Sequence, residues 1–178
     1  MIGAPAQRLR KVALLVSVSL VAVFLPVLLS GSAQAATAFS TTVVNQSNGN
    51  CVDVPGATGA DGAQLIQWPC NSGANQLLTF TPVSGSADTY TIGTVTAGKC
   101  VDVFGASNVD NARIVQWACH DQNNQRFRLQ PVSIGGAAST FNLVSVASGK
   151  CIAPAGDASA GNTGLVQPAC AARAGAAT

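Results

Sequence analysis

Two segments of the chain carry the same aromatic and polar residues at the same spacing. Each segment contains one aspartate, one tryptophan, one asparagine and one glutamine: Asp53, Trp68, Asn75 and Gln76 in the first, and Asp102, Trp117, Asn124 and Gln125 in the second. An aromatic ring can stack on the apolar face of a sugar, while a carboxylate and an amide can hydrogen-bond its hydroxyls. The set therefore indicates a shallow sugar-binding cradle that occurs twice.

These segments belong to a repeat of about fifty residues that is marked by all six cysteines. The leading cysteines, Cys51, Cys100 and Cys151, are 49 and 51 residues apart, and a second cysteine follows each of them after 19 residues. The first two copies share C-V-D-V, Q-W-x-C and N-Q, and the third reads C-I-A-P-A-G and T-G-L-V-Q-P-A-C. A fixed period indicates one supersecondary unit used three times.

The first 35 residues have the features of a secretory signal peptide. Arg8, Arg10 and Lys11 give a positive start, residues 12–29 are apolar, and Ala33-Gln34-Ala35 offers a small-x-small cleavage site. The apolar stretch is close to the roughly 20 residues that span a bilayer, so a retained membrane anchor is the alternative. Because the small-residue site follows directly, we expect cleavage and a secreted protein.

Removal of this segment leaves 143 residues (178 − 35), enough for one domain at 36–178 with repeats at about 38–86, 87–137 and 138–178. The remainder carries 6 Lys/Arg (9 − 3) against 7 Asp and no Glu. Phosphate binding requires clustered cations, so we expect no nucleic-acid partner, and no membrane partner after cleavage. The oligomeric state is not predicted.

The six cysteines of an exported chain indicate disulfides. Six cysteines allow 15 pairings, and repeat equivalence selects one set: Cys51–Cys70, Cys100–Cys119 and Cys151–Cys170. Each bridge closes a loop worth about 3 kcal/mol of stability. With a single histidine and no C-x-x-C pair, the sequence offers no zinc site, and we expect no cofactor.

The apolar runs are short and show no helical period. They lie at residues 42–44, 51–54, 65–68, 77–80, 90–92, 100–103, 113–117, 127–129 and 141–144. Turn dipeptides such as Asn48-Gly49 and Asp61-Gly62 separate them. Many short strands at even spacing predict an all-β, closed or nearly closed architecture.

The repeated C-x-D-V, Q-W-x-C and N-Q-x-(aromatic) motifs resemble the ricin B-type lectin domain, a β-trefoil that also serves as a carbohydrate-binding module. The resemblance covers residue 38 to the C-terminus. The family's Q-x-W signature is changed, because Leu78 and Phe127 stand in the tryptophan position, where we expect core residues. The resemblance implies four strands per repeat, six forming a barrel and six closing one end. Phe80, Tyr90 and Phe141 are also expected in the core.

The resemblance implies a role for each residue of the cradle. In the first repeat Asp53 accepts from two vicinal hydroxyls, Trp68 is the stacking platform, Asn75 is the amide partner and Gln76 holds the site from behind. Asp102, Trp117, Asn124 and Gln125 have the same roles in the second repeat. In the second repeat His120 directly follows Cys119. Xylan-binding members of the family have a histidine at this place, so the resemblance implies that His120 is a second hydrogen-bond donor to the sugar.

Other roles stay open for these residues. Asp53 and Asp102 could cap the turns that follow them, and both tryptophans could be core residues. Strand alternation does not decide whether the tryptophans lie in the core. Ile66 shares a face with Trp68, and Leu65 shares the other face with Gln67, so neither face is purely polar. His120 could be an ordinary surface residue.

The third repeat departs from the pattern. Ala153 replaces the aspartate, Pro168 replaces the tryptophan and the asparagine is absent, so we expect a silent site. Residues 171–178 contain no apolar strand, which predicts an incomplete last strand and an open edge. A truncated sequence, an exposed first strand and a strand supplied by a partner are the open explanations.

Catalysis is not expected from these residues. Glycoside hydrolysis usually needs two carboxylates about 5–9.5 Å apart, and here the aspartates of interest lie one per repeat. The expected function is a secreted, non-catalytic module that binds polysaccharide or galactose- or xylose-type sugars through two shallow sites. The alternatives are a protein-interaction or inhibitor β-trefoil, and a fragment of a larger secreted glycoside hydrolase.

Overall fold

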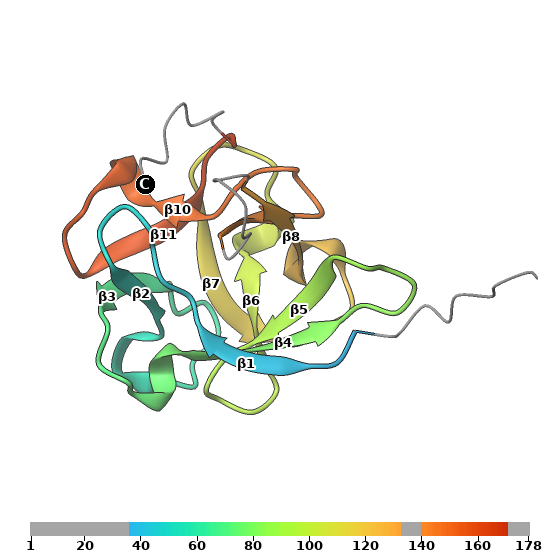
Figure 1. The fold of residues 1–178 in the computed structure, drawn as a ribbon, viewed down its shortest axis with the longest axis horizontal. Helices are drawn as coiled ribbons and strands as arrows, with labels where there is room; N and C mark the ends of the chain where they lie inside the picture. The colour runs from blue at the N-terminus through green and yellow to red at the C-terminus, as the bar shows by residue number, and fades with distance from the viewer. Residues whose placement is uncertain (1–35, 133–139, 171–178) are drawn as a thin grey trace, which may run out of the picture. The chain divides into compact units, whose positions relative to one another are not determined.

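The computed structural model describes residues 36–132 and 140–170, which lie in one unit that begins at Gln34. The predicted signal segment lies outside the described residues. Regular structure in the described part consists of β-strands and short 3₁₀ turns (Figure 1). The strands are β1 (Phe39–Thr42), β2 (Asn50–Asp53), β3 (Ile66–Pro69), β4 (Leu77–Pro82), β5 (Thr89–Gly93), β6 (Lys99–Val103), β7 (Ala112–Ala118), β8 (Arg126–Pro131), β9 (Phe141–Ser145), β10 (Ala153–Pro154) and β11 (Thr163–Gln167).

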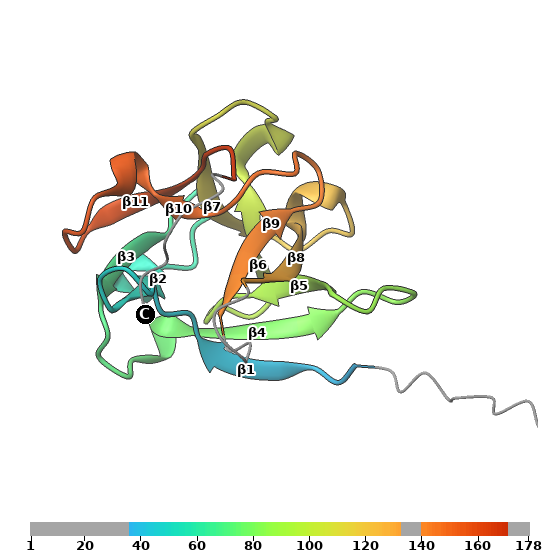
Figure 2. The same cartoon turned by 45° about the horizontal axis from the view of Figure 1, so that its top comes forward.

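Two sets of strands build the domain. Antiparallel neighbours β1, β4, β5, β8 and β9 form one continuous wall, and both views show β1 beside β4 with β5 on its other side (Figure 2). The pairs β2–β3, β6–β7 and β10–β11 form three hairpins, and β11 also pairs with β3 and β7. This arrangement is the predicted β-trefoil.

The first strand of each hairpin ends in the same tight 3₁₀ turn. The turns η1 (Pro55–Ala57), η3 (Phe104–Ala106) and η5 (Ala155–Asp157) follow β2, β6 and β10. Their middle residues are Gly56, Gly105 and Gly156, with φ of 60°, 66° and 63°. Glycine adopts this left-handed conformation without steric cost, so the recurring glycine explains the common backbone path. Two further turns, η2 (Ala74–Gln76) and η4 (Asn123–Gln125), precede β4 and β8.

The two residues that stand in the position of the family tryptophan are buried in the core, as predicted. Leu78 and Phe127 are 1% and 0% exposed, and Phe80 is also buried. Tyr90 is half-buried and makes an edge contact with Phe80. The prediction for Phe141 is wrong, because its side chain is 42% exposed. No ring of the described residues packs against Phe141 as Phe80 packs against Tyr90.

The first strand also differs from its prediction. It covers residues 39–42 rather than 42–44, and Val44 forms only an isolated bridge with Cys51. The reason is pairing with β4, whose register places Phe39 opposite Phe80. The two rings stack at 5.0 Å between centroids, a contact with a distant strand that extends β1 toward the N-terminus.

Burial of the residue eight positions before each leading cysteine depends on how many neighbours its strand has. In the second repeat this residue is Ile92, on a strand flanked by β4 and β8, and it is 1% exposed. Its counterparts Val43 and Leu143 are only partly buried. Among the described strands β1 pairs only with β4, and β9 only with β8. A sixth strand between β9 and β1 would fall in residues 171–178, outside the described residues.

Three buried glutamines link the repeats into a ring. Gln67, Gln116 and Gln167 lie at the same place before the second cysteine of each repeat and are at most 1% exposed. Through Nε2, Gln116 donates to the carbonyls of Thr58 (2.6 Å) and Ala60 (3.0 Å) in the first repeat. Gln167 donates to Ser107 and Val109, and Gln67 to Ala158 and Ala160. Each repeat therefore holds a loop of the preceding one, and the first holds a loop of the third.

Disulfides close the base of each hairpin. The structure joins Cys51 to Cys70, Cys100 to Cys119 and Cys151 to Cys170, the set that repeat equivalence selects. Among the described residues no cysteine is free. The described part also contains no helix long and apolar enough to cross a membrane.

Candidate functional site

Strand register places the aspartate and the tryptophan of each repeat on one face. In the second repeat Asp102 pairs with Val115 while Cys100 pairs with Trp117. Residues two apart on paired antiparallel strands point to the same side as diagonal neighbours, about 7–8 Å apart. The first repeat has the same geometry, since Asp53 pairs with Ile66 and Cys51 with Trp68.

Two consecutive amides hold each aspartate. In the first repeat Asn75 Nδ2 and Gln76 Nε2 both donate to Oδ2 of Asp53, each at 2.8 Å. In the second repeat Asn124 Nδ2 (3.0 Å) and Gln125 Nε2 (2.8 Å) donate to Oδ2 of Asp102. The turns η2 and η4 carry these amides. No hydrogen bond from a described residue reaches Oδ1 of either aspartate, so the amides occupy one carboxylate oxygen and leave the other without a partner in the described part.

The aspartate and the tryptophan of each cradle differ in exposure to solvent. Asp53 and Asp102 are each 3% exposed, whereas Trp68 and Trp117 are 41% and 38% exposed. The tryptophans are therefore not core residues. The aspartates do not cap the turns that follow them, because η1 and η3 have valine at the N-cap and no side-chain cap bond. The arrangement pairs a fixed carboxylate with an open indole face.

The two glutamines position the aspartates from behind. Gln76 and Gln125 are both 0% exposed. Besides the aspartate, each Nε2 donates to a strand carbonyl, that of Pro69 or Ala118. Each Oε1 accepts a backbone N–H, from Asn71 at 2.9 Å or His120 at 2.7 Å. Both side chains are fully buried, and their contacts fix the carboxylate in place.

His120 distinguishes the second cradle from the first, where Asn71 has its place. Its Nε2 lies 3.4 Å from Oδ2 of Asp102, and its side chain is 36% exposed. Its Nδ1 is buried without a hydrogen-bond partner in the described part. Burial raises the pKa of the Asp102 carboxyl above its usual value of 3.8, although bonds from Gln125 and Asn124 and the nearby His120 oppose the rise.

Each indole also lies against a loop of another repeat. A methyl group built on Gly62 of the first repeat would lie 3.4 Å from Cζ3 of Trp117, and one on Gly161 of the third would lie 3.7 Å from Cε3 of Trp68. An ion pair fixes the first of these loops, because Lys99 binds Asp61, the neighbour of Gly62, at 2.6 Å. The cradle is therefore assembled from two repeats, although its polar residues come from one.

Sequence patterns give no prediction for two further residues at the second cradle. The Phe104 ring is 40% exposed and lies edge-on to Trp117, with centroids 6.2 Å apart. The Arg113 guanidinium carbon lies 4.4 Å from the Phe104 centroid. The available signal is the residue after C-V-D-V, which is phenylalanine in the second copy and Pro55 in the first.

The third repeat has no cradle among its described residues. Ala153 is buried where the aspartates stand, and Pro168 occupies the tryptophan position. The position of the asparagine lies outside the described residues.

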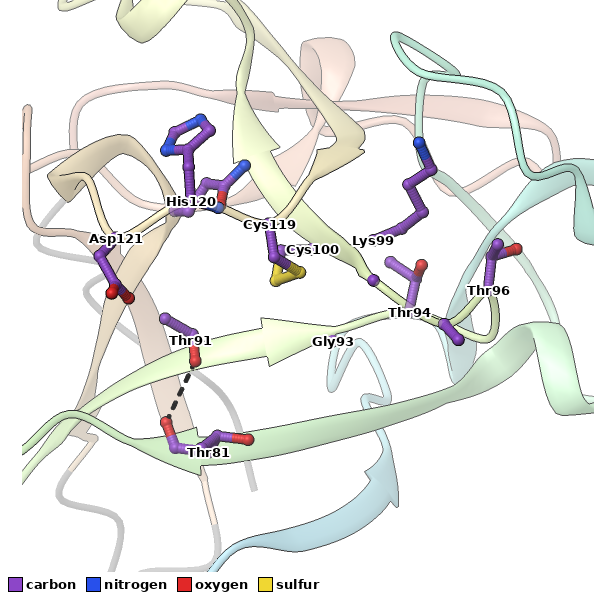
Figure 3. Close-up of a pocket in the computed structure, with 13 residues that line it drawn as sticks. Thr81, Thr91, Gly93, Thr94, Thr96, Lys99, Cys100, Cys119, His120 and Asp121 are labelled. Atoms are coloured by element: carbon purple, nitrogen blue, oxygen red, sulfur yellow. Dashed lines mark hydrogen bonds between the residues drawn. A yellow bond between two sulfur atoms is a disulfide. The ribbon is translucent and has the colours of Figure 1, made fainter.

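A cavity lies beside the second disulfide and not on the indole face. It measures about 340 Å³ and is bordered by β5, the Cys100–Cys119 bridge and the threonines Thr81, Thr91, Thr94 and Thr96 (Figure 3). The side chains of Lys99 and His120 point away from β5 in this view. Neither Asp102 nor Trp117 lines the cavity. Nowhere in the described part do three potential metal ligands gather.

Comparisons with known proteins agree with this geometry. The sequence matches a family described as ricin-type beta-trefoil lectin domain-like over residues 34–117 and again over residues 75–168. The comparison with curated proteins finds no match. Among solved structures, the designed three-fold symmetric protein ThreeFoil is 27% identical, with a TM-score of 0.65 over 73% of this chain and 89% of that one.

Two natural structures show the same fold at lower identity. An exo-beta-1,3-galactanase from Clostridium thermocellum is 23% identical, with a TM-score of 0.66 over 74% of this chain and 27% of that one. The C-half of the earthworm R-type lectin, in complex with GalNAc, is 14% identical, with a TM-score of 0.52 over 72% of this chain and 86% of that one.

Proposed function

The chain belongs to the ricin-type β-trefoil lectin domain-like family, and from this premise we propose that it is a secreted, non-catalytic module that binds carbohydrate through two shallow sites. Membership supports carbohydrate binding in general. The two sites are the cradle of Asp53, Trp68 and Asn75 and that of Asp102, Trp117 and Asn124. The carrying observation is that a buried carboxylate and a half-exposed indole share one face in both repeats.

The chemistry of the cradle suits a polyhydroxylated ligand. The indole stacks on the apolar face of the sugar ring, and Oδ1 of the aspartate accepts from its hydroxyls. The amide of the asparagine orients the carboxylate and lies beside the sugar. One such contact binds weakly, but two sites on one rigid body gain through effective concentration on a polymer. A polysaccharide, with galactose- or xylose-type units, is therefore the proposed ligand.

The surroundings of the aspartates support a binding role over catalysis. Hydrolysis requires a second carboxylate across the scissile bond, whereas amides surround Asp53 and Asp102. The three disulfides support export, because such bonds persist in oxidising compartments. The galactanase and the earthworm lectin are less than 25% identical to this chain. They support the fold alone, and the sugar must come from experiment.

A binding assay with paired tryptophan variants tests the proposal. The mature protein is applied to immobilised xylan, galactan and arabinogalactan. We expect Trp68→Ala and Trp117→Ala each to weaken binding about tenfold, equal to about 1.4 kcal/mol, and the double variant to lose it. Phe141→Ala removes an exposed ring away from the cradles and is the matched control. Circular dichroism verifies the fold.

The assay also separates the alternatives. If the double variant binds as the wild type does, the site assignment is wrong. If the wild type binds none of these polymers nor any member of a broad glycan array, the protein-interaction β-trefoil becomes the better hypothesis.

A further inference from the structure

The second cradle is longer than the first because a second exposed ring adjoins it. Phe104 and Trp117 are 40% and 38% exposed, and their rings meet at an interplanar angle of 60°. In the first repeat Pro55 has the place of Phe104. A ligand that stacks on Trp117 can therefore continue over a second aromatic ring, whereas a ligand on Trp68 meets Pro55 at that place.

Arg113 continues this surface along the same strand. On β7 the residues Arg113, Val115 and Trp117 alternate to one face, the face of Asp102. Four residues of extended strand span about 13 Å, which is longer than one pyranose ring. Phe104 lies between the ends, in contact with both. Trp117, Phe104 and Arg113 are called the aromatic–arginine strip below.

The guanidinium of Arg113 keeps its donors free. The guanidinium carbon lies over the Phe104 ring, 4.4 Å from its centroid, and a guanidinium carries its N–H donors in its own plane. Lys99 and Lys150 are paired with Asp61 and Asp110, but Arg113 forms no ion pair within the described part of the chain. The counterpart in the first repeat is Gln64, a neutral residue that donates to the carbonyl of Leu165 at 3.2 Å. Among the described residues, Gln64 therefore stands in the first repeat where the unpaired cation Arg113 stands in the second.

We propose that the second site binds an acidic oligosaccharide, with a uronic-acid carboxylate on Arg113. A sugar unit stacks on Trp117 beside Asp102, the oligosaccharide continues across Phe104, and the guanidinium binds the carboxylate through two parallel hydrogen bonds. The first site, which has Pro55 and Gln64 in place of Phe104 and Arg113, takes neutral units. This inference rests on the proposed carbohydrate-binding function and specifies the ligand of one of its sites.

The test compares acidic oligosaccharides with their carboxyl-reduced counterparts. Trp68→Ala serves as the background, so that only the second site binds. The probes are fragments of glucuronoxylan, galacturonan and a glucuronic-acid-bearing arabinogalactan, each with its reduced form. For at least one pair we expect about fivefold tighter binding of the acid at low salt, as an exposed ion pair allows. The preference should shrink as salt is raised.

Variants of the cation decide whether Arg113 is responsible. Arg113→Gln should remove the acid preference and leave the affinity for the reduced form unchanged, while Arg113→Lys should retain part of it, because lysine lacks the planar fork. Arg128→Gln changes an exposed arginine on β8 and should have no effect.

Three outcomes would overturn the inference. If no pair shows an acid preference, or if Arg113→Gln keeps it, the Arg113–Phe104 stack is only a surface contact. If the reduced forms still bind in that case, and Trp117→Ala abolishes this binding, the proposed carbohydrate-binding function is unaffected. Binding of no probe in any pair would contradict both.

Discussion

The second and third repeats follow the same backbone path but differ in the residues on one face of their hairpins. Both have the disulfide, the buried glutamine and the left-handed glycine, as Gln116 and Gly105 or Gln167 and Gly156. Only the second has a carboxylate and an indole on that face. The third presents Ala153 and Pro168 instead. The residues that fold a repeat are thus separate from those that form the cradle.

This separation indicates that the domain tolerates loss of a site without loss of its frame. The ring of Gln67, Gln116 and Gln167 includes all three repeats, so the third contributes loop carbonyls to Gln67 even without a cradle. The loop at Gly161 also borders Trp68. A repeat without its own site therefore still shapes the site of another.

The largest expected effect concerns the frame. Gln116→Leu removes the amide donor to the carbonyls of Thr58 and Ala60 and the acceptor of the Thr94 hydroxyl, and should cost about 3 kcal/mol of unfolding free energy. Gln67→Leu and Gln167→Leu should cost similar amounts. Urea unfolding measures all three, with the exposed Gln46→Leu as the neutral control. A much smaller cost for Gln167→Leu would show that the third repeat is not an equivalent part of the frame.

A smaller effect concerns the carboxylate of the second site. Binding requires ionised Asp102, and burial raises its pKa, so acidification should weaken binding with a midpoint above 3.8. Stability changes in the opposite direction, because a raised pKa favours the protonated folded state. This contribution is full below the ordinary value of 3.8 and is lost as pH rises through the folded pKa.

The pH dependence is measured by titrating binding in Asp53→Asn, which leaves only the second site. His120→Asn removes the facing histidine and reproduces Asn71 of the first repeat. Since His120 opposes the rise of the Asp102 pKa, the midpoint should move higher in this variant. A midpoint at or below 3.8 in the Asp53→Asn protein would be inconsistent with a buried acceptor.

The smallest expected effect is a substitution in the third repeat. Ala153→Asp restores the acid but neither the indole nor the amide, so the number of bound sugars should not change. Calorimetry with the preferred sugar measures this number, and circular dichroism verifies the fold. A new site in this variant would mean that the carboxylate alone defines the cradle.

The sequence was sufficient for the features that depend on spacing within a repeat. Equal cysteine intervals predicted the threefold repeat and the disulfides, and the family position of Leu78 and Phe127 predicted their burial. Alternation alone did not decide whether the tryptophans lie in the core, and the common face of Asp102 and Trp117 depends on the register of β6 and β7. The roles of individual side chains toward a sugar remain predictions.

Features that depend on contacts between repeats could not be predicted in this way. The sequence around Gln116 does not distinguish it from other strand glutamines, because its hydrogen-bond partners lie in the 58–60 loop of another repeat. Phe141 and Tyr90 occupy equivalent positions, but only Tyr90 has rings of distant strands around it. The strip of Trp117, Phe104 and Arg113 lies within one repeat, but it depends on how the turn η3 places the Phe104 ring against two residues of β7.

The central claim is that the chain binds sugar at the cradles of its first two repeats and nowhere else, and the stoichiometry of binding tests it most directly. Isothermal titration with a short oligosaccharide should give two sites for the wild type, one for Asp53→Asn, one for Asp102→Asn and none for the double variant. Undiminished binding by the double variant, or three sites in the wild type, would contradict the account.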